Sequence, residues 1–384
     1  MEIREYTEDD RDVLIRMRKL AFANTSAPPE RIVVPGRFGL LAEQDGTALG
    51  GLLINEFGQY FGGRAVPMGG IGAVTVDPHS RGRGVASALL DAALRTMREH
   101  GQPLSVLYAT VPALYRGRGW ERAGVAERLD FPLDRLLMSP KAPRRLATRR
   151  ATEADLDDIR ACYLKLASTV DGLLDRRPPA TDPKKLLDLD VATVVHDDDG
   201  VLTGYLTAAR EPDHLRTQDL IGHDLDTQLT LLAELTSWAG VLDRVSVRIV
   251  DPAFTGLLTS QAIRFDVLTS LWMLRVVDLP AAVAARGWPN ADALKPGAVD
   301  LEITDEHAPW HAGRHRLVVD DGKVRLEPGG TGATRLHARA LGPWFSGMQD
   351  THALRRAGLL DGDAAPLLDH LVATPGTPRL ADFF

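Results

Sequence analysis

The chain of 384 residues is too long for one ordinary domain, and its 44% hydrophobic and 25% charged residues are typical of a globular protein. A formal net charge of −7 argues against non-specific nucleic-acid binding and is compatible with cationic substrates. The single cysteine, Cys162, excludes an internal disulfide and a cysteine-based metal cluster, and we expect a buried structural thiol and no bound metal. No apolar run reaches the ~18 residues of a membrane helix. The N-terminal residues have no signal-peptide core, so we expect a cytoplasmic protein without a membrane span.

The first residues of the chain have a counterpart near residue 149. Residues 4–14 and 149–159 share five matching positions, which are Arg4 and Arg149, Thr7 and Thr152, Glu8 and Glu153, Asp10 and Asp155, and Asp12 and Asp157. Each copy predicts a short strand, a threonine N-cap and an acidic first turn of helix. A β-hairpin with an acidic-glycine turn follows each, over 40–54 and over 192–208. The chain therefore begins with two copies of one α/β unit.

The most informative stretch is residues 74–87, which read Val-Thr-Val-Asp-Pro-His-Ser-Arg-Gly-Arg-Gly-Val-Ala-Ser. An alternating apolar strand ends at Asp77, a turn rich in arginine and glycine follows, and a helix is predicted from Val85 to about His100. The first N–H groups of a helix have no partner within it and lie at the positive end of its dipole, which suits a pyrophosphate.

Two residue types in this turn fit an anion. Gly82 and Gly84 have no side chain to hold a phosphate away from the backbone, and they tolerate positive φ. Arg81 and Arg83 add charge-assisted hydrogen bonds. The alternative is a strand–turn–helix with two solvated arginines, but the flanking strand and helix favour the binding interpretation.

The spacing of Arg81, Gly84 and Ala86 resembles the acyl-CoA signature of the GNAT N-acetyltransferases, Q/R-x-x-G-x-G/A. The second copy has no such signature before its predicted helix over 226–238. We therefore expect that copy not to bind CoA, and to serve as a scaffold or as one wall of a substrate cleft.

A strand is predicted over 105–110, after the helix of the signature. The GNAT resemblance implies that the fourth and fifth strands splay apart around the pantetheine arm, with Thr110 and Val111 at the mouth of the gap. Tyr115 is then the candidate general acid that protonates the departing CoA thiolate, since GNAT enzymes commonly carry a tyrosine here. The alternative is a core tyrosine whose hydroxyl lies at the surface.

The rest of the chain predicts a linker near 139–148, a strand over 272–277 and a short helix over 279–288. Strands follow over 300–304 and 315–327, the latter folded at 320–322, and helices over 350–357 and 365–372. This third region has no repeat partner, and we interpret it as an α+β domain.

The whole layout resembles the Eis (enhanced intracellular survival) family of acetyltransferases. The resemblance implies an α/β (α+β) protein with an N-terminal GNAT domain, a degenerate central GNAT-like domain and a C-terminal sterol-carrier-protein-like domain. We place these domains at 1–140, 141–279 and 280–384. The resemblance also implies a homohexamer.

The resemblance further assigns site residues. Its acetyl-CoA contacts correspond to Val74, Thr75, Val76, Arg81, Gly82, Arg83, Gly84, Val85, Ala86, Ser87, Thr110 and Val111. The general acid corresponds to Tyr115, and the general base to the terminal carboxylate of Phe384. The closing run Leu-Ala-Asp-Phe-Phe is apolar enough to be buried, and burial raises the pKa of a carboxylate. The alternative is that Phe383 and Phe384 only pack onto the last domain. One departure from the family pattern, Arg118 in place of an aromatic residue, puts acceptor specificity in question.

Together these features predict an acetyl-CoA-dependent N-acetyltransferase for cationic small-molecule amines such as aminoglycosides, modified at one or several positions. The backbone of the 74–76 strand would stabilise the thioester oxygen. Two alternatives stay open: a lysine acetyltransferase acting on proteins or peptides, and a lipid- or partner-binding protein with a vestigial CoA site.

Overall fold

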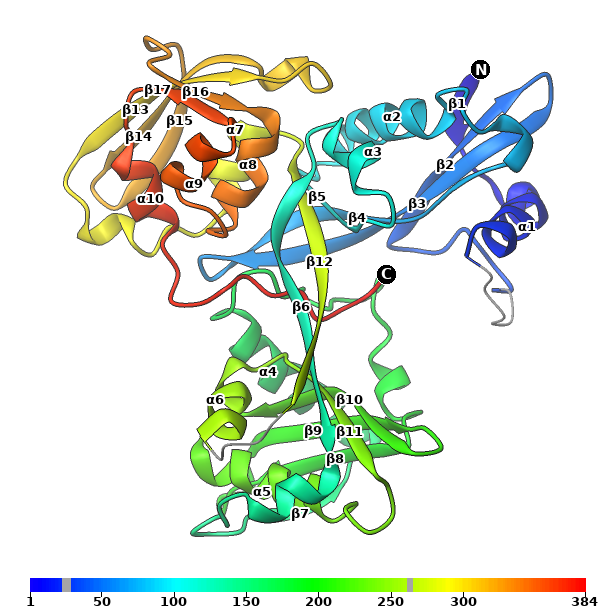
Figure 1. Cartoon of the computed structure of the whole chain (residues 1–384), viewed down its shortest axis with the longest axis vertical. Helices are drawn as coiled ribbons and strands as arrows, with labels where there is room; N and C mark the ends of the chain where they lie inside the picture. Colours follow the sequence, from blue (N-terminus) through cyan, green and yellow to red (C-terminus); the bar gives the residue numbers. More distant parts are fainter. Residues whose placement is uncertain (23–28, 261–264) are drawn as a thin grey trace.

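The computed structural model describes residues 1–22, 29–260 and 265–384, and these residues form two β-sheets (Figure 1). The larger sheet has twelve strands in the order β1-β2-β3-β4-β5-β12-β6-β11-β10-β9-β8-β7, and the smaller has five in the order β15-β14-β13-β16-β17. In the part of the chain that is described, each helix is too short or too polar to cross a membrane.

The first unit carries the strand–turn–helix that the sequence singles out. Its elements are β1 (Glu2–Glu5), α1 (Arg11–Phe22), β2 (Arg37–Gln44), β3 (Thr47–Phe61), β4 (Arg64–Val76), α2 (Val85–Glu99), β5 (Leu104–Tyr108), α3 (Pro112–Arg116) and β6 (Glu121–Pro132). Leu89, Leu90 and Leu94 form the apolar face of α2 and are fully buried, which holds this helix against the sheet.

The second unit repeats the first, as the sequence predicts. Its elements are β7 (Ala147–Arg150), α4 (Leu156–Ala167), β8 (Val191–His196), β9 (Leu202–Arg210), β10 (His214–Gly222), α5 (Leu225–Thr236), β11 (Arg244–Arg248), α6 (Pro252–Ser260) and β12 (Asp266–Val276).

The matching residues of the two copies form the same capping interactions at the start of a helical segment in each unit. Thr7 and Asp10 form a capping box at the start of the first helical segment, and Thr152 and Asp155 form the same box in the second. The aspartate of each box also pairs with the arginine of the preceding strand, at 2.8 Å for Arg4 and 2.6 Å for Arg149.

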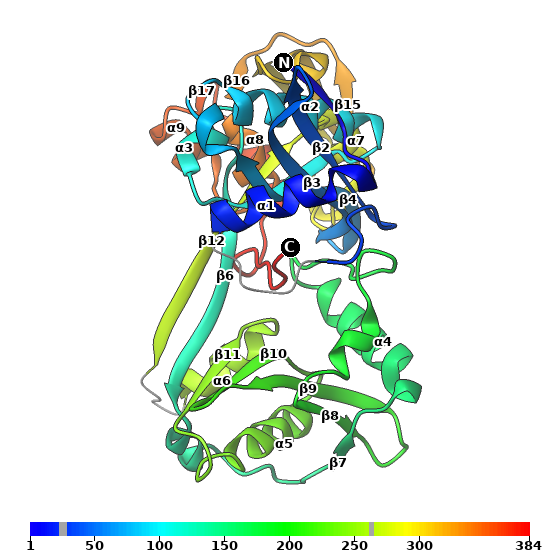
Figure 2. The same ribbon diagram turned by 90° about the vertical axis from the view of Figure 1, so that its right-hand side faces the viewer.

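The two units complete each other's sheet. β12 is the last strand of the second unit, yet it inserts between β5 and β6 of the first, pairing Trp272–Val276 with β5 and Asp266–Leu274 with β6. In return, β6 pairs with β11 of the second unit. Figures 1 and 2 show β6 and β12 side by side, running from one unit to the other. The predicted strand over 272–277 corresponds to only the buried half of β12, because residues 266–271 are exposed and show no core-facing alternation.

The third unit is built on the five-stranded sheet. Its elements are α7 (Leu279–Ala285), β13 (Gly297–Thr304), β14 (Gly313–Asp320), β15 (Lys323–Pro328), β16 (Thr334–His337), α8 (Ala338–Phe345), α9 (Thr351–Arg356), β17 (Leu360–Gly362) and α10 (Pro366–Val372). The predicted hairpin at 320–322 is confirmed, with positive φ at Asp321 and Gly322. α8 was not predicted from the sequence, because glycine and proline, here Gly342 and Pro343, normally end helices. Gly342 is required here, because a Cβ atom would lie 2.4 Å from the Leu274 carbonyl oxygen of β12.

After α10 the chain leaves the third unit and returns to the other two (Figure 1). The amide of Leu380 donates to the Val125 carbonyl of β6, and the amide of Arg379 donates to the Asp171 carbonyl that follows α4. The C-terminal segment is therefore fixed between the first and second units before it reaches Phe384.

Candidate active site

The glycine-rich turn leaves the N-terminus of α2 open. β4 ends at Val76, and residues 81–84 are exposed, whereas Val85 is buried as the first residue of α2. Gly82 and Gly84 have φ values of +75° and +78°. A Cβ atom at either position would meet nothing within 4 Å, so backbone conformation and not packing requires these glycines. The turn that leads into α2 is therefore exposed and free of packed side chains, as an anion site needs.

The splayed strands that the GNAT resemblance implies are present. β4 and β5 pair only through Met68, Gly69 and Gly70, although β4 continues to Val76. On its other side β4 contains a bulge, since Gly51 pairs with Thr75 while Leu53 pairs with Gly72. Ala73 within the bulge has a φ of +49°. The backbone of β4 beyond Gly70 therefore has no ladder partner in β5 and borders a gap.

Tyr115 is part of the short helix α3, which follows β5 in the chain. It is 5% exposed and packs edge-on against Trp120 with ring centroids 6.5 Å apart. Burial raises the pKa of its phenol, and a side-chain hydrogen bond with Thr110 offsets part of this rise. The phenol is therefore protonated at neutral pH. Thr110 and Val111 are exposed directly after β5.

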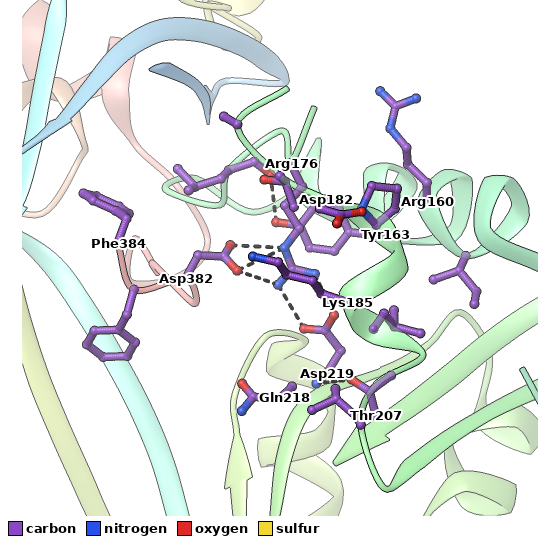
Figure 3. Close-up of a pocket in the computed structure, with 18 of the residues that line it drawn as sticks. Arg160, Tyr163, Arg176, Asp182, Lys185, Thr207, Gln218, Asp219, Asp382 and Phe384 are labelled. Carbon is purple, nitrogen blue, oxygen red and sulfur yellow. Dashed lines mark hydrogen bonds and ion pairs between the residues drawn. The ribbon is translucent and has the colours of Figure 1, made fainter. Parts of the chain in front are cut away.

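A cleft of about 690 Å³ lies between the first and second units (Figure 3). Residues of the second unit form much of its lining, together with Arg37, Asn55, Phe57 and Arg128 of the first unit and the C-terminal segment from Asp382. Tyr115 is not among the described residues that line this cleft.

Phe384 lies on a face of β4 that consists of glycines. A Cβ atom at Gly70 would come within 2.6 Å of the Phe384 ring, and one at Gly72 would come within 3.1 Å of its carboxyl oxygen. Phe57 contacts the same ring, with centroids 5.3 Å apart. The carboxyl group of Phe384 is thus next to the bulge of β4. The run Met-Gly-Gly-Ile-Gly at 68–72 is the sequence signal of this approach, because glycines inside a strand mark a close neighbour.

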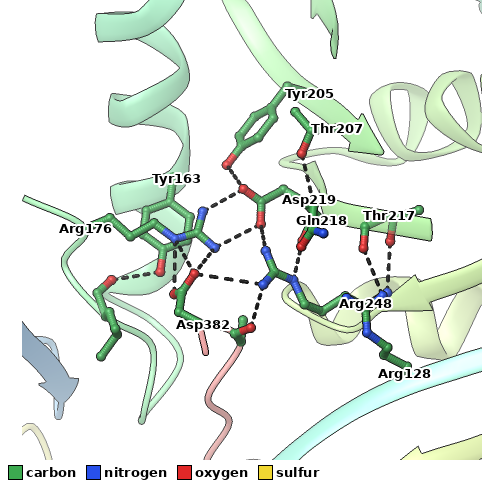
Figure 4. Close-up of polar contacts among 12 residues, drawn as sticks. Arg128, Tyr163, Arg176, Tyr205, Thr207, Thr217, Gln218, Asp219, Arg248 and Asp382 are labelled. Atoms are coloured by element: carbon green, nitrogen blue, oxygen red, sulfur yellow. Dashed lines mark hydrogen bonds and ion pairs between the residues drawn. The ribbon is translucent and has the colours of Figure 1, made fainter. Parts of the chain in front are cut away.

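A buried ion network fixes the residues before Phe384 (Figure 4). Arg176 contacts Asp219 at 2.6 Å and Asp382 at 3.0 Å, and Arg248 contacts Asp219 at 2.9 Å. Arg248 also donates to the Ala381 carbonyl at 2.6 Å, and Tyr108 donates to the Asp382 carbonyl at 3.2 Å.

The network is charge-balanced around Asp219. Burial alone would raise the pKa of Asp219, but Arg176 and Arg248 outweigh burial and hold its pKa below the usual range. Arg176 also lies over the ring of Tyr163 at 3.9 Å. Arg176, Asp219 and Arg248 were not predicted from the sequence, because their partners are far away in the chain.

The expectation of a buried chain end is wrong for Phe383. Ala381 is buried and Phe384 is half-buried, but Phe383 is 58% exposed. The reason is that Phe383 stacks on Tyr108 at 4.3 Å with its other face toward the open cleft.

Arg118 does not line the cleft. It donates to the Ser87 carbonyl and pairs with Asp91 at 3.1 Å, which holds the turn after Tyr115 against α2.

Cys162 is buried on α4 as expected, and burial raises the pKa of its thiol to about 12. That thiol is therefore not a nucleophile at neutral pH.

The splayed strands, the bulge and the open glycine-rich helix start define the class of the first unit, an acyltransferase of the GNAT type. Comparison with known proteins agrees: a GNAT acetyltransferase domain matches residues 2–123, and a sterol carrier protein domain matches residues 279–381. An uncharacterized N-acetyltransferase of Streptomyces coelicolor is 30% identical over 321 residues, covering 77% of this chain and 75% of that protein.

Solved structures extend the similarity to the whole chain. A GCN5-related N-acetyltransferase from Anabaena variabilis has a TM-score of 0.85 at 27% identity, and Eis1 from Mycobacterium abscessus has one of 0.77 at 22%. Both alignments cover 100% of each chain. The chain therefore belongs to the GNAT N-acetyltransferases, and its fold is that of an Eis-like member with a C-terminal sterol-carrier-protein-like domain. Membership implies acetyl-CoA as the co-substrate.

Proposed function

We propose that this enzyme transfers the acetyl group of acetyl-CoA to an amine bound in the 690 Å³ cleft. The observation that carries the proposal is the position of Phe384, whose carboxyl group lies against Gly72 where β4 and β5 separate. The GNAT resemblance implies that the acetyl group of acetyl-CoA lies at the point where β4 and β5 separate. A base and the acyl donor would therefore meet at one point.

The proposed donor site follows the open features of the first unit. The N–H groups at 82–87 and the side chains of Arg81 and Arg83 bind the pyrophosphate. The pantetheine arm lies between β4 and β5, alongside residues 74–76 and next to Thr110 and Val111. Backbone N–H groups near the bulge of β4 hydrogen-bond the thioester oxygen, which stabilises the negative charge that develops there.

The proposed reaction uses two protein groups. The carboxylate of Phe384 accepts a proton from the acceptor ammonium, and the free amine nitrogen then forms a bond to the acetyl carbon. As the tetrahedral intermediate collapses, the carbon–sulfur bond breaks and the Tyr115 hydroxyl donates its proton to the departing thiolate. The Phe384 carboxylate passes the first proton to solvent. It then accepts the second proton that the nitrogen must lose to become a neutral amide. Tyr115 is reprotonated from solvent.

The acceptor class is the finer part of the proposal. The Eis resemblance suggests aminoglycosides, and a lysine side chain of a protein is the alternative. A lipid-carrier role is less favoured, because Leu341, Trp344 and Phe345 of the third unit are fully buried and fill the interior around α8. On the resemblance alone we also propose a homohexamer, which light scattering tests.

A thiol-release assay with acetyl-CoA tests the function. The purified chain is incubated with aminoglycosides, polyamines, amino acids and lysine peptides, and products are weighed by mass spectrometry. We expect one class to give amine-dependent CoA release and a product that gains one or more acetyl groups. Absence of amine-dependent release together with absence of acetyl-CoA binding by calorimetry would contradict the proposal.

A further inference from the structure

The cleft is rich in positive charge, although the whole chain carries a net charge of −7. Seven cationic side chains line it, against three aspartates and the end of the chain. The cationic residues are Arg37, Arg128, Arg160, Arg176, Lys185, Arg216 and Arg248. This balance is unfavourable for a polycation such as an aminoglycoside, because a cleft concentrates the field of the charges along its walls.

Two of the three aspartates of the cleft do not offset this charge for an incoming ligand. Asp219 is already paired with Arg176 and Arg248, and Asp382 with Arg176 (Figure 4). The side chain of Asp182 accepts only from the neutral Lys184 amide, at 3.0 Å, so its negative charge remains. Arg216 pairs with Glu211 at 3.6 Å. The four other cations still outnumber Asp182 and the terminal carboxylate of Phe384, so the charge that a ligand meets is positive.

Four of those cations have no acidic partner. In residues 1–22, 29–260 and 265–384, no aspartate or glutamate oxygen lies within 4.0 Å of a charged nitrogen of Arg37, Arg128, Arg160 or Lys185. Arg37 donates to the Asn55 amide oxygen at 2.8 Å, and Arg128 donates to the Thr217 carbonyl at 3.0 Å. Both contacts are with neutral groups and leave the positive charges uncompensated.

Arg128 shows the consequence most clearly. It extends from β6 into the cleft wall near Arg216 and Arg248. Burial, followed by the repulsion of these two arginines, lowers the pKa of Arg128 to about 10. An anion beside Arg128 would relieve this repulsion, whereas an ammonium group would increase it.

Arg37 places positive charge close to the proposed base. The Asn55 amide nitrogen lies 3.9 Å from the point where a Cβ atom of Gly72 would be, and a carboxyl oxygen of Phe384 lies 3.1 Å from the same point. Since Arg37 is hydrogen-bonded to Asn55, the cationic wall begins next to the place where the amine would react.

We propose that the acceptor is an amine that also carries an anionic group, a carboxylate or a phosphate, and that Arg37, Arg128 and Lys185 bind this group. The proposal rests on the proposed function for the fate of the amine. It replaces the polycationic acceptor with a molecule whose amine reaches Phe384 while its anionic end lies against the arginines.

Matched acceptors test this charge preference in the full-length protein. Glucosamine 6-phosphate is compared with glucosamine, tyrosine with tyramine, and kanamycin serves as the polycation. We expect kcat/KM to be at least about 10-fold higher for the anionic member of one pair, which is the effect of one charge-assisted hydrogen bond. This advantage should decrease as salt is added, because salt screens the attraction between the anion and the cations of the cleft. The pair with the larger ratio distinguishes phosphate from carboxylate.

Variants connect the preference to the cleft. Arg128→Gln is expected to reduce the anionic-to-neutral ratio of kcat/KM by about 10- to 100-fold, mainly through KM. Lys185→Gln, at an exposed position, reduces the ratio in the same direction without the risk of unfolding. Arg325→Gln, which removes a cation from β15 of the third unit, is the matched control and keeps the ratio.

The outcomes separate this proposal from the proposed function. Equal or better acetylation of glucosamine, tyramine or kanamycin would overturn the anionic acceptor while acetyl transfer stands. If no amine is acetylated, calorimetric titration with glucosamine 6-phosphate and glucosamine decides. If glucosamine 6-phosphate binds more tightly than glucosamine and this difference is lost in Arg128→Gln, the anion site is supported even though the proposed acetyl transfer has failed. If the two ligands bind equally, the anion site is overturned.

Discussion

The guanidinium of Arg176 and the carboxylate of Asp382 lie 3.0 Å apart, although 206 residues separate them in the chain. Arg176 follows the first helix of the second unit, and Asp382 immediately precedes the two final phenylalanines. The second unit lacks the CoA signature, yet its Arg176 and Arg248 hold the segment that precedes Phe384. We infer that its role is to position the proposed base and to form the wall of the acceptor cleft.

Asp382→Asn and Arg176→Met test this positioning role. Asp382→Asn removes the side-chain charge that pairs with Arg176 and leaves Asp219 paired with both arginines, so we expect kcat to fall by about 10-fold with little change in thermal stability. Arg176→Met breaks a buried ion network and should cost about 3–5 kcal/mol of unfolding free energy as well as activity. Steady-state kinetics and thermal unfolding check both variants. Wild-type kcat in Asp382→Asn would show that the ion pair does not position Phe384.

Gly84→Ala should weaken acetyl-CoA binding, and Gly46→Ala should not. The two glycines have φ values of +78° and +74°, and a Cβ atom at either meets nothing within 4 Å. The substitutions therefore impose the same backbone strain, about 1–2 kcal/mol. Only Gly84 begins the helix that would bind the pyrophosphate, so we expect about a 10-fold rise in the acetyl-CoA Kd for this variant alone. Calorimetry measures both, and an equal loss of affinity would rule out the proposed anion site.

Tyr115→Phe should reduce kcat by about 10²- to 10⁴-fold while leaving acetyl-CoA affinity near the wild-type value. Because burial raises the pKa of Tyr115, the acid form persists across neutral pH, and wild-type kcat should not fall on the alkaline side below pH about 10. Tyr6→Phe is the control, since Tyr6 is also buried and donates to a carbonyl, that of Ile32. If the two variants have the same kcat, Tyr115 is only a core tyrosine.

Stability should decline as the solution becomes acidic. Arg149 lowers the pKa of Asp155 through its hydrogen bonds, and Arg176 and Arg248 hold that of Asp219 below the usual range against the effect of burial. Because these folded-state pKa values lie below the unfolded value of about 3.9, their stabilisation is complete above pH ~4 and is lost as pH falls below it.

Arg149→Gln tests the sign of this effect. The variant returns the pKa of Asp155 toward its ordinary value, so unfolding temperatures measured from pH 6 to pH 3 should fall less steeply than in the wild type. A steeper fall in the variant would contradict the linkage. Lys323→Gln, at an exposed position of the third unit, should leave the slope unchanged.

The sequence predicted the features whose partners are close in the chain. The capping boxes of Thr7 and Thr152 are complete within three residues, and the turn at Gly82 and Gly84 is enclosed by its own strand and helix. The exchange of β6 and β12 was not predictable in this way, because a strand pattern does not show which sheet the strand enters.

The charge of the cleft could not be predicted from the sequence either, because its residues are far apart in the chain. Asp219 lies 43 residues from Arg176, and the charge of the cleft depends on which cations the fold leaves without a carboxylate. The net charge of the chain led to the prediction of a cationic acceptor, whereas cationic side chains outnumber aspartates in the lining of the cleft.

The most direct test of the proposed site is to compare a chain that lacks Phe384 with the variant Phe384→Leu. Removing Phe384 moves the terminal carboxylate one residue back from Gly72, whereas leucine keeps the carboxylate at its place and loses only the ring. We predict that the deletion lowers kcat by at least about 10²-fold with unchanged acetyl-CoA binding and unfolding temperature, and that Phe384→Leu retains most of its turnover. Turnover of the deletion variant equal to that of the wild type, in a thiol-release assay with the same acceptor, would contradict the assignment of the base and the location of the reaction.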